Sequence, residues 1–367
     1  MKILLLSAYD ALSHSQWCKG LMHHLPEHHW QYVTLPARYF SWRARGNALS
    51  FYARDKALLA QPYDLIVATS MVDLVGLRGL IPQLANTPCF YFFHENQFAY
   101  PDNSQQQSTL ELQLLSIYNA LSAERVCFNS AFNQQTFVSG AKALLKKMPD
   151  FSPQTLADEI LTKSQVIPVP VEPQWFVGQP KPNTQPLKIL WAHRREWDKG
   201  PDRLLAIVEQ LCQQQRPFEL HLAGQQFRQQ PDCFAQLAER LQGSPAGKLI
   251  DHGFIEDEQA FRAMVQQCDI SLSTALHDFQ GLSMIQSAAS RLQPVAPDRL
   301  AYPEFFPAAN LYQSDLENIQ QEAKSAVEVI MQVSAKPTQH DLSQLSWQQL
   351  KQCYATAFNL TGAHSSA

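Results

Sequence analysis

The sequence predicts an α/β protein made of two doubly wound domains, each with a mainly parallel sheet. A length of 367 residues suits two domains of about 100–200 residues each. Short apolar runs alternate with longer segments in which apolar residues recur at helical spacing. A stretch from 149 to 186 holds eight prolines in 38 residues and separates two such series.

The first series predicts a sheet covered on both faces, because its apolar runs lack polar alternation. The predicted strands are 3–7, 30–35, 65–69, 89–93 and 125–129, and the predicted helices are 110–121 and 132–147. The second series predicts strands 187–192, 219–223, 248–251, 269–273 and 293–296, helices 201–214, 234–241, 258–267 and 283–290, and a helical tail after 308. The predicted organisation is therefore a first domain 1–165, a linker 166–186 and a second domain 187–367 with that tail. The expected site is the cleft between the domains, at the carboxyl ends of strands.

Composition excludes several classes of protein. An apolar fraction of 45% excludes a disordered chain, and a net charge of −4 is not typical of a chain that binds a polyanion over its whole surface. The first apolar run stops before Asp10, too early for a signal peptide, and no transmembrane stretch occurs. We therefore expect a cytoplasmic protein without a membrane partner.

No metal site is expected. The cysteines are odd in number and form no CxxC pair, and Asp-x-Asp is absent from the motifs below. Pro26 interrupts the histidine-rich segment 23–29, which we interpret as a polar helix end.

Three segments place polar residues directly after predicted strands. Arg194 and Lys199 follow strand 187–192, where cations can hold a diphosphate, although a surface salt-bridge cluster with Glu196 and Asp198 is the alternative. Asp278, Gly281, Leu282 and Gln286 follow strand 269–273 and open a helix whose N-terminus suits an anion. His94, Glu95 and Asn96 follow strand 89–93 and suit proton transfer or sugar binding, or else a hydrogen-bonded turn.

Together these segments resemble family 4 retaining glycosyltransferases of the GT-B fold. Within them the chain is most similar to the tRNA-queuosine α-mannosyltransferases. Four motifs carry the resemblance. They are residues 93–97 followed by Tyr100-Pro101, residues 42–45 followed by Ala48-Leu49, His193-Arg194 followed by Asp198-Lys199, and residues 297–304. The resemblance spans the chain to about residue 306 and implies two Rossmann-like domains that face each other across a cleft.

The resemblance also implies roles for single residues. Arg194 and Lys199 would hold the donor diphosphate, with Gly281 and Leu282 beside it. Asp278 and His94 would contact the donor sugar, and Gln286 the nucleotide ribose. The implied catalytic residues are His94, Asp278, Arg194 and Lys199. The implied acceptor-binding residues are Ser13, His14, Arg43, Arg45, Glu95 and Asn96.

The chain departs from the family pattern at three places. Ala11 and Leu12 stand where the branch usually has two glycines, Asp278 replaces a Glu, and Gln286 replaces a second Glu. A Gln can still bind ribose hydroxyls, but it lacks the charge that strengthens such bonds about two-fold.

Residues 31–60 carry a local net charge of +4 with interleaved aromatic residues, a composition that suits an unpaired RNA loop. The alternative is a solvated loop with aromatic anchors. The implied reaction transfers mannose from GDP-mannose to queuosine in a tRNA anticodon, without a metal or other cofactor. The alternatives are a GT-B enzyme with another nucleotide sugar or acceptor, and a catalytically weak RNA-binding relative. The sequence leaves the oligomeric state open.

Overall fold

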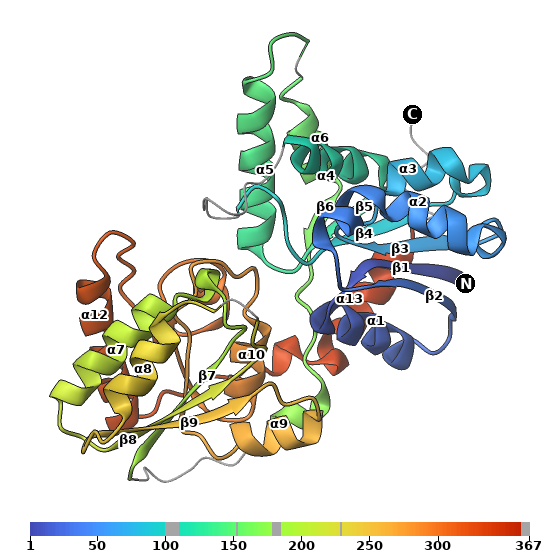
Figure 1. Ribbon diagram of the computed structural model, residues 1–367. Coiled ribbons are helices and arrows are strands. Elements are labelled where there is room, and N and C mark those ends of the chain that lie inside the picture. Colours follow the sequence, from blue (N-terminus) through green and yellow to red (C-terminus); the bar gives the residue numbers. More distant parts are fainter. Residues whose placement is uncertain (100–109, 152, 178–184, 228–229, 361–367) are drawn as a thin grey trace. The chain divides into compact units, whose positions relative to one another are not determined.

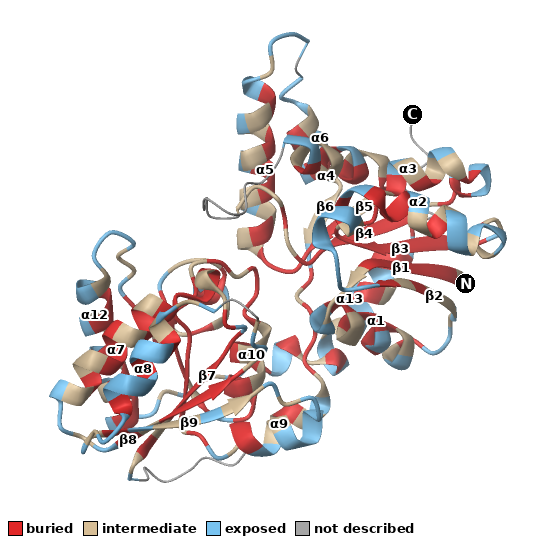
Figure 2. Cartoon of the chain, viewed as in Figure 1, coloured by how far each residue is buried: buried red, intermediate tan, exposed pale blue. Residues whose placement is uncertain are grey.

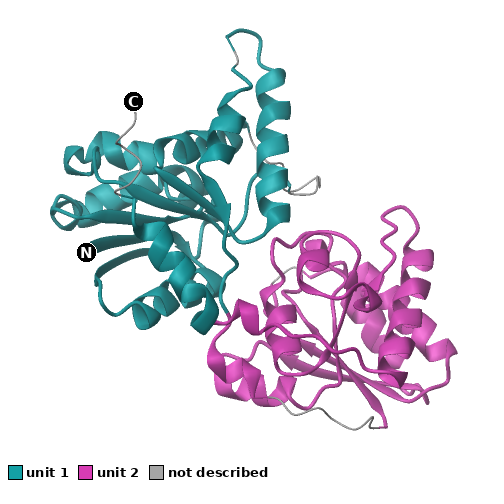
Figure 3. Cartoon of the chain, turned by 180° about the vertical axis from the view of Figure 1, so that it is seen from behind, with its two compact units in different colours: residues 1–170, 347–367 teal, residues 171–346 magenta. Residues whose placement is uncertain are grey.

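A computed structural model describes residues 1–99, 110–151, 153–177, 185–227 and 230–360. The chain forms two compact units, shown in Figure 3. Unit 1 comprises residues 1–170 and 347–367, and unit 2 comprises residues 171–346. In the described part of the chain, no helix is both long and apolar enough to cross a membrane.

Unit 1 is built on a parallel sheet of six strands in the order β2-β1-β3-β4-β5-β6. The strands are β1 (Lys2–Asp10), β2 (His29–Pro36), β3 (Leu65–Thr69), β4 (Cys89–Phe93), β5 (Arg125–Phe128) and β6 (Ser164–Val166). The helices are α1 (Leu12–His24), α2 (Phe40–Leu59), α3 (Leu74–Leu80), α4 (Leu110–Ser122), α5 (Ala131–Lys146), α6 (Leu156–Thr162) and α13 (Trp347–Phe358). The strand order reverses between β1 and β3, which makes the carboxyl ends of these strands the expected ligand position.

Helices cover both faces of the unit 1 sheet, and its central strands β1, β3, β4 and β5 are mainly buried (Figures 1 and 2). One face packs against α2, α3, α4 and α5. The other face packs against α1 and α13, where Tyr354 accepts a hydrogen bond from the Trp17 indole at 3.0 Å and lies against Phe90 and Phe92 of β4.

Unit 2 repeats this plan with the order β12-β11-β10-β7-β8-β9, also parallel. The strands are β7 (Leu187–Ala192), β8 (Phe218–Ala223), β9 (Gly247–Gly253), β10 (Ile270–Leu272), β11 (Gln293–Pro297) and β12 (Leu311–Tyr312). The helices are α7 (Pro201–Gln213), α8 (Cys233–Leu241), α9 (Glu258–Val265), α10 (Leu282–Ala289), α11 (Tyr302–Phe305) and α12 (Ile319–Ala335). In β7 alternate side chains enter two separate cores, one with α7, α8 and α12 and one with α9 and α10.

All ten predicted strands are present, and the α/β class is confirmed. The predicted domain bounds differ from the observed units in two ways. The tail divides, so that α12 belongs to unit 2 while α13 joins unit 1, because its aromatic face covers the sheet of unit 1. The segment predicted as linker is also partly packed, since β6 begins before it and Trp175 is buried against unit 2. Residues 178–184, with Pro180 and Pro182, lie outside the described residues, as do Tyr100 and Pro101.

Candidate active site

In unit 2 the loops after β7 and β10 meet where the strand order reverses. Lys199 ends the short 3-10 helix Trp197–Lys199, and its Nζ lies 3.8 Å from the Asp278 carboxylate. The same Nζ donates a hydrogen bond to the His277 carbonyl at 2.6 Å and lies 3.4 Å from Asp198. Two predicted donor-site residues are therefore brought together by adjacent parallel strands.

Gly200 lets the two loops pack closely. It has a φ of +63°, and a Cβ there would collide with the Thr274 carbonyl oxygen. The Thr274 hydroxyl donates to the Lys199 carbonyl at 2.7 Å and accepts from the Trp191 indole at 2.9 Å. These buried hydrogen bonds fix the backbone on which Lys199 is carried.

Asp278 is held as a carboxylate at the start of α10. Its Oδ1 accepts from the Gly281 N–H at 2.9 Å and its Oδ2 from the Tyr302 hydroxyl at 3.3 Å. Burial by itself would raise the pKa of Asp278, but nearby Lys199 and other positive or donor groups lower the pKa below its usual value. Gly281 caps α10 with a φ of +72°, and no side chain caps the helix, so its first N–H groups are available to an anion.

His193 is the first residue after β7 and is buried beside this pair. Burial and the charge of Lys199 lower the pKa of His193 to about 4, so the ring is neutral at pH 7. Its Nε2 has no hydrogen-bond partner among the described residues. The sequence motif included His193, but no role was predicted for it.

Arg194 and Gln286 lie at the more accessible side of this site. The Arg194 side chain is half exposed, with its guanidinium 2.6 Å from Glu196 and 4.0 Å from Asp198. The salt-bridge cluster that the sequence offered as an alternative is therefore present. Gln286 is half-buried on the second turn of α10 and makes no side-chain hydrogen bond to another described residue.

In unit 1 a second polar cluster lies at the reversal of strand order between β1 and β3. His14 comes from the first turn of α1 and His94 follows β4, and their rings stack with centroids 4.1 Å apart. His14 Nε2 lies 3.3 Å from Glu95. Burial, with a smaller effect of His14, holds the pKa of His94 well below its usual value. His94 Nε2 and His14 Nδ1 are buried without a hydrogen-bond partner among the described residues.

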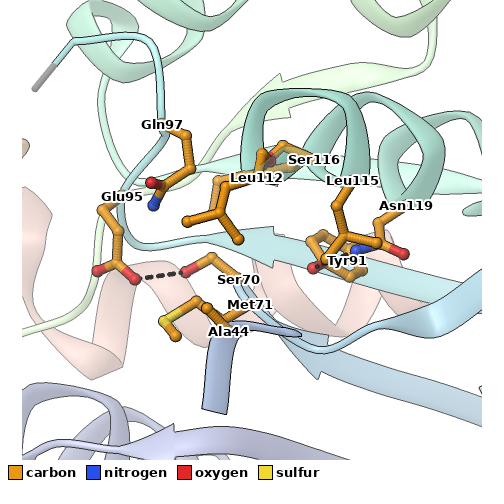
Figure 4. A pocket seen from close by; sticks show the side chains of 11 residues that line it. Ala44, Ser70, Met71, Tyr91, Glu95, Gln97, Leu112, Leu115, Ser116 and Asn119 are labelled. Carbon is orange, nitrogen blue, oxygen red and sulfur yellow. Dashed lines mark hydrogen bonds between the residues drawn. The ribbon is translucent and has the colours of Figure 1, made fainter. Parts of the chain in front are cut away.

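A small hollow adjoins this cluster (Figure 4). Glu95 lies at its edge and accepts a hydrogen bond from the Ser70 hydroxyl at 3.1 Å. The remaining walls mix apolar side chains from α4 and β4 with the polar groups of Gln97, Ser116 and Asn119. Ser70 was not predicted, because no charged or aromatic residue marks it in the sequence.

Two other residues predicted to bind the acceptor, Asn96 and Ser13, differ in burial. Asn96 is buried, and its amide bonds to Asn133 and Thr136 while its oxygen accepts from the backbone of Phe98 and Ala99. We assign Asn96 a structural role, because these bonds use up its polar atoms. Ser13 is exposed on the first turn of α1.

The two α2 arginines that were predicted to bind the acceptor, Arg43 and Arg45, also differ. Arg45 pairs with Glu111 at 2.8 Å, whereas Arg43 has no carboxylate within 4.0 Å among the described residues. Only Arg43 therefore keeps an uncompensated charge.

Comparison with solved structures identifies the fold. A sucrose-phosphate synthase from Thermosynechococcus elongatus matches 98% of this chain and 99% of its own, with a TM-score of 0.68 and 13% identity. HepE of Anabaena, solved in complex with UDP, matches 97% of this chain and 100% of its own, with a TM-score of 0.62 and 15% identity. The fold is that of the GT-B glycosyltransferases, as predicted, and this chain is a glycosyltransferase.

Sequence comparison identifies the family. Residues 2–171 match the model of the tRNA-queuosine alpha-mannosyltransferase N-terminal domain. A tRNA-queuosine alpha-mannosyltransferase of Drosophila melanogaster is 32% identical over 322 residues, which cover 84% of this chain and 83% of that protein. The chain belongs to the tRNA-queuosine alpha-mannosyltransferase family, which confirms the resemblance seen in its motifs.

Proposed function

We propose that this chain transfers mannose from GDP-mannose to queuosine in a tRNA anticodon, with retention of the anomeric configuration. The observation that carries the proposal is the meeting of Lys199 and Asp278 at the start of α10, in a chain of this family. A diphosphate leaving group needs positive charge, and a sugar needs a fixed hydrogen-bond acceptor. Lys199 and Asp278 offer these two groups side by side.

The donor diphosphate would lie between Lys199, Arg194 and the N-terminus of α10. Charge develops on the diphosphate as its bond to the sugar breaks, and fixed cations and backbone N–H groups stabilise that charge. Arg194 would exchange its contact with Glu196 for the phosphate, which its exposure permits. We propose that these groups act without a metal ion.

The sugar and ribose would be held by the other residues of the site. Asp278 accepts hydrogen bonds as a carboxylate and would orient a sugar hydroxyl. Gln286 would bind the ribose from the second turn of α10. In unit 1, neutral His94 can bind a sugar hydroxyl through its unpartnered Nε2, and the His14–Glu95 pair would hold the acceptor hydroxyls. The departing phosphate oxygen would take the acceptor proton on the same face, so that no protein nucleophile is required.

The direct test is mass spectrometry of tRNA nucleosides after incubation of the purified chain with GDP-mannose. We expect queuosine to gain one hexose, and tRNA that lacks queuosine to remain unchanged. Parallel reactions with UDP- and ADP-sugars test the donor. Transfer from a UDP-sugar instead would overturn the donor assignment, and absence of product despite GDP binding would overturn the acceptor assignment.

A further inference from the structure

Three aromatic side chains gather on the surface of unit 1 where α2 begins. Tyr39, Phe40 and Trp42 are 71%, 40% and 51% exposed. We call these three residues the α2 aromatic patch. Exposed apolar patches on a soluble unit mark interaction sites more often than isolated exposed residues do.

The indole of Trp42 is held in place by the backbone of α2. A Cβ at Gly46, one turn further along the helix, would lie 2.6–2.8 Å from three atoms of the six-membered ring of Trp42. Glycine is unfavourable inside a helix, but here it allows the ring to lie directly on the backbone. The indole thus has one supported side and one exposed side before any partner binds.

The two other rings of the patch are also fixed. Tyr39 adopts a left-handed backbone conformation, with φ 55° and ψ 57°, and the Arg38 guanidinium lies 5.7 Å from its ring centroid. Phe40 packs edge-on against Tyr9 near the end of β1, at 5.7 Å between centroids. A strained conformation at an exposed non-glycine residue is typical of functional surfaces.

Two arginines beside the patch, Arg38 and Arg43, carry positive charges that no nearby carboxylate of the described chain compensates. Arg38 is exposed and Arg43 half-buried, and neither has a carboxylate within 4.0 Å in the described ranges. Arg45 and Arg54 on the same helix are instead paired with Glu111 and Asp55. Within the described residues, Arg43 donates hydrogen bonds only to neutral acceptors, the Pro36 carbonyl at 3.3 Å and the Ser50 hydroxyl at 3.5 Å. The patch therefore presents aromatic faces next to two guanidinium groups that no carboxylate in the described part of the chain neutralises.

We propose that the α2 aromatic patch is a stacking platform for unpaired nucleotides, with Tyr39 and Trp42 as ring surfaces and Arg38 and Arg43 as phosphate contacts. The inference rests on the proposed function, because it names the surface that takes the RNA acceptor. Unpaired bases of a loop stack on exposed aromatic rings, while their phosphates attract arginine. A duplex offers phosphates but no free base faces, so the patch favours a single-stranded loop.

The test measures binding of a fluorescein-labelled, unmodified anticodon stem-loop RNA by anisotropy across a salt series. Stacking contributes about 1–3 kcal/mol per base, so Trp42→Ala should weaken binding about 5- to 150-fold without changing the salt slope. Trp42→Phe should restore most of the affinity. Arg43→Ala should instead reduce the slope by about 0.7, the value of one released counterion on single-stranded RNA.

Tyr118→Ala is the matched control, because Tyr118 is 52% exposed on α4 of the same unit. We expect this variant to bind RNA as the parent protein does. A fully paired RNA hairpin with the loop replaced by a non-nucleotide linker should bind the parent and Trp42→Ala equally. If Trp42→Ala binds the stem-loop within two-fold of the parent, the stacking platform is wrong.

Failure of the platform is distinguishable from failure of the proposed function. Trp42→Ala and Arg43→Ala should keep the thermal shift produced by GDP, which we expect to bind unit 2. The melting temperature without GDP reports on correct folding of the variants. Loss of stem-loop binding in Trp42→Ala, in a protein that transfers no hexose to queuosine, would support the platform and overturn the proposed function. If Trp42→Ala transfers hexose with an unchanged KM for tRNA and binds the stem-loop as the parent does, the proposed function is supported and the stacking platform is wrong.

Discussion

Lys199 Nζ lies 3.8 Å from the Asp278 carboxylate, although the two residues follow different strands. They meet because β7 and β10 are neighbours in the sheet of unit 2 and both point their carboxyl ends at the same edge. The ammonium group keeps the pKa of Asp278 low despite burial, which by itself would raise it. Lys199 therefore supports the ionised state of the Asp278 carboxylate until a substrate arrives.

Replacement of Lys199 by Met should weaken GDP binding about ten- to hundred-fold. A hydrogen bond to a charged group contributes about 1.5–3 kcal/mol, and Lys199 is nearly buried, so solvent cannot replace it. Isothermal titration with GDP measures the effect. Lys324→Met, at an exposed position of α12, is the matched control and should bind GDP as the parent does. Equal GDP affinity in both variants would remove Lys199 from the donor site.

Asp278→Asn should reduce kcat for mannose transfer about 10²-fold, the size expected when one fixed electrostatic group is lost. The amide oxygen can still accept the Gly281 N–H, so the turn into α10 and the GDP affinity should survive. Asp278→Glu restores the charge and should recover part of the rate. Steady-state rates with GDP-mannose test both variants, and an Asp278→Asn protein with normal kcat would contradict the assigned role.

Arg43 and Arg45 of α2 should differ in their effect on RNA binding. Arg45→Ala removes a charge that Glu111 already neutralises, whereas Arg43→Ala removes an uncompensated one. We therefore expect Arg43→Ala to weaken binding of full-length tRNA several-fold at low salt, and Arg45→Ala to change it less than two-fold. Filter binding at several salt concentrations distinguishes them. A larger loss in Arg45→Ala would show that Glu111 releases Arg45 when RNA binds.

Acidification should destabilise unit 2 through His193. Its pKa falls from 6.5 in a free side chain to about 4 in the folded protein, so between these values the unfolded chain binds more protons. The free energy of unfolding therefore decreases as pH falls through this window, by up to about 1.4 kcal/mol per pH unit. In urea unfolding, His193→Gln should lose about 2 kcal/mol less than the parent between pH 7 and pH 5.

The comparison between variant and parent isolates His193, because other buried histidines with a lowered pKa, such as His94, are present in both. An unchanged pH dependence in His193→Gln would show that the ring does not titrate as the structure indicates.

The sequence predicted the strands well, because most of them are short apolar runs and the central strands are buried on both faces. It missed β6 and β12, which have three and two residues at sheet edges, too few for a pattern. It also missed α2, whose buried face includes Gly46 and Asn47 in place of large apolar residues. Asn47 is buried because its amide bonds to the Met71 carbonyl and the Asp73 N–H, and this partnership leaves no mark in the local pattern.

The order of residues along the chain is enough to place Lys199, Asp278, His94 and Glu95 at strand ends. Which of these charges meet depends on the strand order in each sheet, and contacts between distant segments set that order. Tertiary contacts also pair Arg45 with a carboxylate but give Arg43 none among the described residues, use up the polar atoms of Asn96, and add α13 to unit 1. The spacing of apolar residues shows which residues share a face of one helix or strand. Charge compensation and burial depend instead on side chains from other elements, and the local spacing contains no information about them.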